Sequence, residues 1–168
     1  IWYYGNLART AWLDSGLRAY PIAATYTYNL VNHEVGNDDK ETASTTAITA
    51  SITSSEFDLE DGNNFVFISR LLPDVTFTGS SAASPAAVMT FLPLQDSGSG
   101  YNSPASEGGN DAATVTQTAT VPIEEFTGEA YVRLRGRQLA VKMESTAVGV
   151  KWQLGSPRLD MRPDGRRG

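Results

Sequence analysis

Residues 132–167 read VRLRGRQLAVKMESTAVGVKWQLGSPRLDMRPDGRR, and this stretch has the clearest strand pattern in the chain. Apolar residues alternate with Tyr131, Arg133 and Arg135 over residues 130–135, and the alternation resumes over residues 138–145. The link between them is short, and its Gly136 can supply the positive φ of a tight turn. We therefore predict a hairpin whose two strands pair and share a basic, solvent-facing side. A third strand at residues 148–154 is expected to extend the same sheet.

The rest of the chain has the same β character. Further strands are predicted at residues 24–31, 46–53, 65–72, 75–79, 87–92, 114–121 and 159–162, with turns such as Asp61-Gly62 between them. The run Phe65–Ile68 is almost continuously apolar, which favours a central strand covered on both faces. We place Phe67 and Trp152 in the core. The predicted fold is all-β, an antiparallel β-sandwich or barrel-like module with long Ser/Gly-rich loops.

Length and composition indicate one main domain. The chain has 168 residues and no cysteine, so its core must form without disulfides or thiolate metal sites. No apolar run approaches the ~20 residues of a membrane span. We predict a β-sandwich structural domain at residues 24–168, with a Ser/Gly-rich exposed loop at about 95–113 in which Tyr101 is the one large anchor. A flexible excursion with no partner is the alternative for that loop.

Residues 1–23 are read as an aromatic lead-in segment that continues from a preceding domain. Trp2, Tyr3, Tyr4 and Trp12 are expected to pack on that domain or on a neighbouring subunit. The alternative is that these aromatic side chains fill the core of this domain itself.

Charge is divided unevenly along the chain. Residues 129–168 contain nine basic and four acidic side chains, a balance of +5, whereas the remainder has a balance of −11. Such a division suits assembly in which a basic patch of one subunit meets an acidic patch of the next, although a solvated charged face is the alternative. The acidic total disfavours nucleic acid as a partner. In the tail, Arg158, Asp160 and Arg162 share one side of the predicted strand, so we expect pairing with carboxylates across a strand or a subunit boundary.

Candidate chemistry is sparse. The one histidine, His33, stands beside Glu34 and ahead of Asp38 and Asp39, but neighbouring strand residues point to opposite faces and do not converge on a metal. The acidic run at residues 56–64 lacks the spacing of an EF-hand loop. No Gly-x-Ser-x-Gly elbow or phosphate-binding loop occurs. A glycosidase needs only two carboxylates, so composition leaves that class open. We predict no enzyme, no metal site and no cofactor.

Two blocks of the sequence carry a resemblance to a known group of proteins. The first runs from Arg135-Gly136-Arg137-Gln138 through Glu144-Ser145 and Trp152-x-Leu154-Gly155 to Arg158-x-Asp160-x-Arg162-Pro163-Asp164-Gly165-Arg166-Arg167; the second contains His33-Glu34-x-Gly36-Asn37-Asp38-Asp39, Phe57–Gly62, Phe65–Phe67 and Pro73–Phe77. Together they resemble the C-terminal region of tail-associated structural proteins, of the hub or nozzle type, from tailed bacteriophages. The blocks cover residues 33–78 and 131–167, and the Ser/Gly-rich middle is unmatched.

The resemblance implies a structural role. A protein of this group is synthesised in the cytoplasm of the host bacterium and becomes part of the virion tail, where it assembles in a ring and contacts neighbouring tail or portal subunits. The interface candidates are Trp2, Tyr3, Tyr4, Trp12, Tyr101, Arg158, Arg162, Arg166 and Arg167. The alternative is a carbohydrate- or receptor-binding β-sandwich in which exposed aromatic rings stack on sugars.

Overall fold

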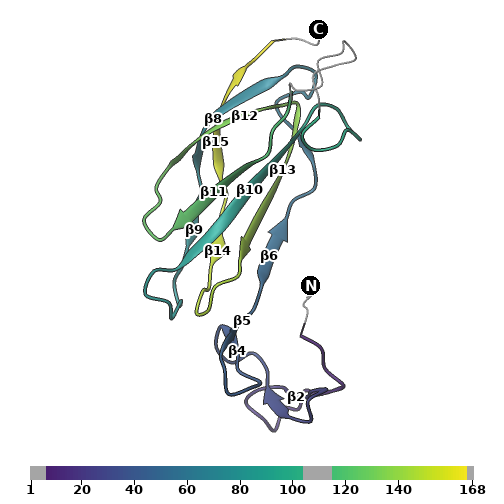
Figure 1. Ribbon diagram of the computed structural model, residues 1–168, viewed down its shortest axis with the longest axis vertical. Coiled ribbons are helices and arrows are strands. Elements are labelled where there is room, and N and C mark those ends of the chain that lie inside the picture. Colours follow the sequence, from purple (N-terminus) through teal and green to yellow (C-terminus); the bar gives the residue numbers. More distant parts are fainter. Residues whose placement is uncertain (1–6, 104–114, 166–168) are drawn as a thin grey trace.

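The structure is a computed structural model that describes residues 7–103 and 115–165. Two larger antiparallel sheets form most of its body, which consists of the described residues from 50 onward (Figure 1). The β10 sheet has the order β11 (Ala119–Glu124), β10 (Ala86–Leu94), β13 (Gln138–Ser145) and β6 (Ala50–Thr53), and β7 (Phe57–Asp58) also pairs with β13. The β8 sheet has the order β12 (Ala130–Gly136), β8 (Val66–Leu72) and β15 (Arg158–Pro163).

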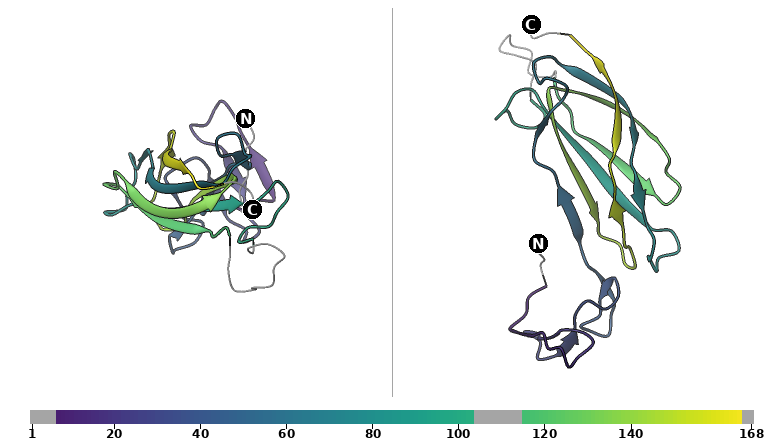
Figure 2. Two further views of the ribbon diagram at one scale, coloured as in Figure 1. Left: turned by 90° about the horizontal axis from the view of Figure 1, so that it is seen from above. Right: turned by 180° about the vertical axis from the view of Figure 1, so that it is seen from behind.

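The two sheets share one hydrophobic core. It is built from alternate residues of both sheets: Val66, Ile68 and Leu71 of β8, Val132 and Leu134 of β12, Ala87, Met89 and Phe91 of β10, Ile123 of β11, and Leu139 and Met143 of β13. Figure 2 shows the strands of the body as two layers when seen from above. The predicted alternation of buried and exposed side chains in β12 and β13 is therefore confirmed.

The predicted hairpin of residues 130–145 is wrong. β12 pairs with β8 and β13 pairs with β10, so the chain passes from one sheet to the other at Gly136 and Arg137. Alternation fixes which side of a strand is buried but does not identify its neighbour. Gly136 does not have a positive φ; a Cβ at this position would lie 2.9 Å from the Cβ of Pro93, so the residue is needed for close approach.

Two core predictions also need correction. Phe67 lies on the outer face of the β8 sheet, half-buried beneath the Arg162 guanidinium, because the alternation of β8 turns Val66 and Ile68 inward instead. The β8 strand is central in its sheet, as predicted, but its outer face is not covered by another described layer. Trp152 packs at the margin of the core, where its indole N–H donates a 3.0 Å hydrogen bond to Ser145.

Several short strands differ from their predicted ranges. Of residues 148–154, only β14 (Gln153–Leu154) is a strand, and it pairs with β9 (Val75–Thr76) instead of extending β13. The positive φ of Gly149 turns the chain at the start of this segment. The predicted strand at residues 114–121 begins outside the described residues and is observed as β11.

Residues 7–49 form a small lobe at one end of the body, at the lower end of Figure 1. Its main sheet has the order β1 (Ala11–Leu13), β2 (Ile22–Ala24) and β3 (Leu30–Asn32), and β4 (Asp38–Asp39) pairs with β5 (Thr46–Ala47). The strand predicted at residues 24–31 is interrupted by a turn in which Tyr28 has a φ of 65°. β2 spans the predicted domain boundary between residues 23 and 24, and that domain division stays a prediction.

The all-β class is confirmed. The described residues contain no helix and hence none able to span a membrane. No sheet of the described chain closes on itself, and the finer choice between a sandwich and a barrel stays a prediction.

Candidate functional site

The lobe displays apolar side chains outward. The exposed large residues are Leu7, Trp12, Leu13, Leu17, Tyr20, Tyr26, Tyr28, Leu30, Val35 and Ile48, and Leu17 and Tyr28 are 98% and 99% exposed. Of the hydrophobic residues in the lobe, Ala23 alone is fully buried. A cluster of exposed apolar side chains on so small a unit is typical of a surface that another molecule covers.

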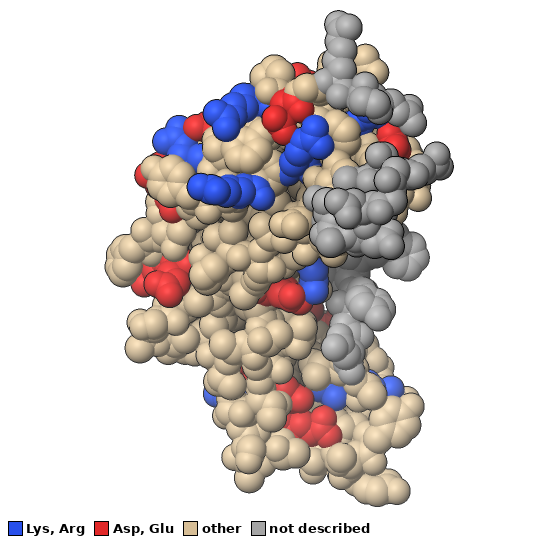
Figure 3. Space-filling view, turned by 45° about the horizontal axis from the view of Figure 1, so that its top comes forward, with Lys and Arg blue, Asp and Glu red and all other residues tan. Residues whose placement is uncertain are grey.

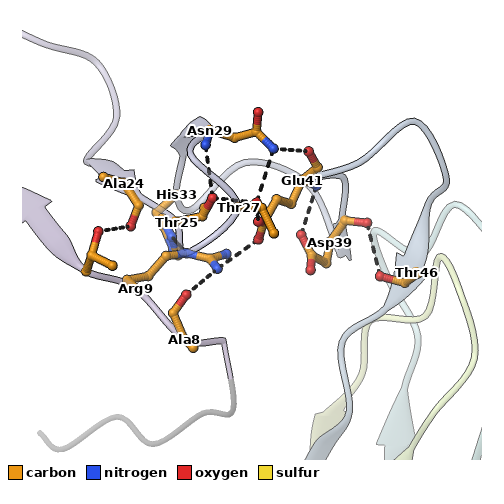
Figure 4. A network of polar contacts seen from close by, with 11 residues as sticks. Ala8, Arg9, Ala24, Thr25, Thr27, Asn29, His33, Asp39, Glu41 and Thr46 are labelled. Carbon is orange, nitrogen blue, oxygen red and sulfur yellow. Dashed lines mark hydrogen bonds and ion pairs between the residues drawn. The ribbon is translucent and has the colours of Figure 1, made fainter.

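Inside the lobe, the half-buried Arg9, His33 and Glu41 belong to a network of polar side chains that continues to the exposed Thr27 and Asn29 (Figure 4). Arg9 donates from Nε to His33 Nε2 at 2.8 Å and from Nη1 to Glu41 Oε2 at 3.1 Å. The second oxygen of Glu41 accepts from the Thr27 hydroxyl, and Asn29 donates to the Glu41 carbonyl at 3.5 Å. These contacts join the segment before β1, the turn between β2 and β3, and the residue after β3 to the segment between β4 and β5. The lobe is thus held by hydrogen bonds and an ion pair, with its apolar groups left for outside contacts.

Two titratable groups of this network have shifted pKa values. Burial lowers the pKa of His33, and the nearby Arg9 lowers it further. The hydrogen bond from Thr27 lowers the pKa of Glu41, with Thr25 and Arg9 acting in the same direction. A neutral His33 and an ionised Glu41 are the states that can both accept from Arg9.

The histidine motif has a structural use. The His33 ring is held by Arg9 and lies 4.5 Å from the Trp12 ring, centroid to centroid. Asp38, considered above as a possible metal ligand, accepts a hydrogen bond from the backbone N–H of Gly149 at 2.6 Å. The neighbouring Asn37 donates a hydrogen bond to the Gly79 carbonyl at 2.9 Å. Within the described ranges no group of three or more possible metal ligands comes together. This motif therefore fastens the lobe to two turns of the body, a role that the sequence did not indicate.

The second surface is the outer face of the β8 sheet, which carries Tyr131, Arg133, Arg135, Phe67, Arg70, Arg158, Asp160 and Arg162. Arg70 pairs with Asp160 at 2.7 Å and with Glu129 at 3.1 Å, and Arg135 pairs with Asp164 at 2.6 Å. Figure 3 shows the largest basic patches over one end of the body, with acidic side chains beside them. Folding therefore brings charged residues from the two differently charged parts of the sequence together, as in the pairs of Arg70 with Asp160 and Glu129.

The interface candidates do not meet at one place. Trp12 is exposed on β1 of the lobe, whereas Arg158 and Arg162 lie on β15 of the body. Tyr101 is 42% exposed and its hydroxyl donates to Glu56 at 3.0 Å, which raises the pKa of the phenol. The remaining candidates, Trp2, Tyr3, Tyr4, Arg166 and Arg167, lie outside the described residues, as do residues 104–113 of the predicted loop.

Sequence reasoning missed the most exposed residues of the lobe. Tyr26 and Tyr28 stand in a segment whose alternation resembles a strand, but the Asn at position 29 is typical of a turn and could have indicated one. Comparison with known proteins adds no identification, because no family model and no curated protein matches this chain.

Proposed function

We propose that the protein is a structural component of a bacteriophage virion, a tail protein of the nozzle or hub type that assembles in a ring and contacts neighbouring tail or portal subunits. The single observation that carries the proposal is the lobe, which is polar inside and apolar outside. Its assignment to a phage tail rests on the two resembling sequence blocks. In this role the protein is synthesised in the host cytoplasm, is found in the virion tail and has no catalytic activity.

The composition of the lobe surface supports a protein partner. Aromatic side chains dominate the energetics of protein interfaces, and the exposed set contains one Trp and three Tyr. Burial of apolar surface gains about 25 cal/mol per Å², so covering several of these side chains would supply much of an association energy. Exposed ion pairs contribute only about 0–1 kcal/mol each and would set orientation instead.

A carbohydrate- or receptor-binding module is the second candidate function. A small hollow of the lobe is lined by Leu17, Arg18, Ala19, Tyr20 and Asn32. A tyrosine ring beside an amide and a guanidinium is a combination that can stack on a sugar ring and hydrogen-bond its hydroxyls. The protein contacts of the lobe and the sugar contacts of this hollow would use overlapping residues.

One experiment separates the two functions. Purified particles of the phage that encodes the chain are analysed by quantitative mass spectrometry, and the isolated protein is tested on an array of bacterial surface glycans. The structural role predicts a fixed copy number of the protein per particle. It also predicts that the isolated protein shows no glycan binding that depends on Tyr20, as tested with Tyr20→Ala. Absence from particles, together with glycan binding that requires Tyr20, would replace the structural role with the second candidate.

A further inference from the structure

The β15 strand lies at an edge of the β8 sheet. It pairs with β8 on one side, and no described strand pairs with its other side. Five of its six residues are exposed, and Met161 among them is 44% exposed. An edge of this length presents unpaired backbone groups to which another strand can bind.

Charge alternates along this edge on one face of the sheet. The order is Arg158, Asp160, Arg162 and then Asp164 just beyond the strand. Both carboxylates are already paired within the chain, Asp160 with Arg70 and Asp164 with Arg135. Arg158 and Arg162 form no ion pair with any carboxylate of the described chain. The edge therefore offers two arginines that have no ion-pair partner in the described chain, although Arg162 also lies over the Phe67 ring.

We infer that two copies of this chain pair through β15, antiparallel, about a twofold axis at Met161. The alternation of charge is self-complementary in this register. Arg158 then lies opposite the partner's Asp164, and Asp160 lies opposite the partner's Arg162, with the same contacts repeated across the axis. Each carboxylate comes to lie between an arginine of its own chain and an arginine of the other. Opposite charges at directly facing positions of an antiparallel pair are stabilising.

Two features select the register with its axis at Met161: the charges of the facing residues, and the side of the sheet on which each side chain lies. An axis at Asp160 would set Asp160 against its own copy and Arg158 against the partner's Arg162, which are repulsive pairs. A shift by one residue would turn charged side chains toward apolar ones. With the axis at Met161, the opposite face of the strand brings Leu159 beside the partner's Pro163 and the two Met161 side chains together, so exposed apolar surface is covered.

The backbone of β15 is suited to this pairing. Asp164 donates its N–H to the Phe65 carbonyl at 2.8 Å, toward the β8 side. Because backbone groups alternate in direction along a strand, those of Met161 and Leu159 face the free edge. The two Met161 residues can exchange hydrogen bonds, and Leu159 can donate to the partner's Pro163 carbonyl. Pro163 has no N–H to donate, which removes one bond on each side of the axis. The charged residues fall at the closer, non-hydrogen-bonded positions.

This contact joins identical surfaces and uses no residue of the lobe. It is therefore a second assembly contact, independent of the virion role and of the ring contact proposed above. A protein present in particles but unable to pair through β15 would overturn this inference alone. A protein that pairs through β15 but is absent from particles would overturn the virion role alone.

Cross-linking tests the axis directly. The chain has no cysteine, so Met161→Cys introduces its sole thiol. Opposed Cα atoms of a hydrogen-bonded antiparallel pair lie about 5.5 Å apart, which is within disulfide range. We expect rapid disulfide dimer formation by M161C under mild oxidation at micromolar concentration. The matched control Tyr131→Cys, on the exposed edge strand β12 of the same sheet, should cross-link at least tenfold more slowly. Equal rates for the two variants would overturn the proposed axis.

Charge reversal tests the recognition. In sedimentation equilibrium, Arg158→Glu with Arg162→Glu should weaken dimerisation more than tenfold, because neither arginine has a carboxylate partner in its own described chain. Arg133→Glu, with the same kind of charge change on the same face, should dimerise as the natural chain does. Mixing the first variant with Asp160→Lys/Asp164→Lys should restore a heterodimer. A natural chain that stays monomeric at about 100 μM, well above a micromolar Kd, or a double reversal that leaves dimerisation unchanged, would contradict the inference.

Discussion

Arg137 and Asp96 form a 2.8 Å ion pair at the point where the chain passes between the two sheets of the body. The arginine is only 7% exposed, and its guanidinium lies over the Phe65 ring. Its backbone is used as well, because its N–H donates to Leu94 and its carbonyl accepts from Leu59. Arg137 thus holds the crossing between β12 and β13 in place, and Asp96 neutralises its buried positive charge.

Removal of that counter-charge should destabilise the body. Among the described residues, Arg137 Nε has no hydrogen-bond partner, so Asp96→Ala would leave a buried cation without its ion pair. We expect the free energy of unfolding to fall by about 1–3 kcal/mol, below the value for a fully buried pair because Asp96 is partly exposed. Urea unfolding measures this change. Glu129→Ala, which breaks a surface ion pair with Arg70, is the control and should cost less than about 1 kcal/mol. Equal losses in the two variants would refute the role of the Arg137 pair.

A methyl group at the crossing should be costly. A Cβ at Gly136 would lie 2.9 Å from Pro93 Cβ and 3.1 Å from the Gln138 carbonyl oxygen, and neither neighbour is a flexible chain end. We expect Gly136→Ala to lower the free energy of unfolding by about 1–3 kcal/mol. Gly128→Ala is the matched control, since no atom of the described residues lies within 4 Å of its added Cβ, and its effect should stay within about 0.5 kcal/mol. A G136A variant as stable as G128A would show that the two sheets do not meet there as described.

Acid should loosen the lobe before the body. The pKa of His33 in the folded protein lies below 6.5, the value of a free imidazole, so the unfolded chain binds the proton more readily. Stability of the lobe should therefore be complete above pH 6.5 and decrease as the pH falls toward the lower folded value. The pKa of Glu41 is also lowered, from 4.5, so its contribution should be lost at still lower pH.

Hydrogen exchange measured across this pH range tests the order of events. After correction for intrinsic exchange, protection of the His33 amide, which donates to Pro21, should fall first, while amides of β10 stay protected. His33→Gln keeps an acceptor for Arg9 but does not titrate, so it should abolish the first step. Parallel loss of protection in lobe and body would contradict the separate acid response of the lobe.

The alternation of apolar and polar residues predicts which side chains of a strand are buried, but not which strand lies next to it. In residues 130–145 it identified the buried side chains Val132, Leu134, Leu139 and Met143. It could not show that the two strands lie in different sheets, because their partner strands, β8 and β10, are distant in the sequence and alternation does not identify a partner. Phe67 was misplaced for a related reason, since an apolar run does not show which of its residues faces outward.

The candidate site was only partly accessible from sequence. Trp12 was predicted to be an interface residue, and it is exposed. The exposure of the other apolar side chains of the lobe was not predicted, because it depends on the polar network of Arg9, His33 and Glu41 that holds the lobe together. These residues are 8 to 32 positions apart in the chain, and their meeting depends on the turns that separate β1 to β5. Local sequence patterns do not indicate which residues distant in the chain form hydrogen bonds with one another.

Incorporation of lobe variants into particles tests the central claim most directly. Leu17→Ser with Tyr28→Asn removes two fully exposed side chains of the lobe, and Asn suits the positive φ at position 28. Phe126→Ser is the control, because Phe126 is 92% exposed on the turn after β11 of the body. When each variant is supplied in place of the natural protein during infection, we predict that the lobe variant folds but is depleted at least tenfold from purified particles, whereas F126S is incorporated normally. Incorporation of both variants at the natural copy number would contradict assembly through the lobe.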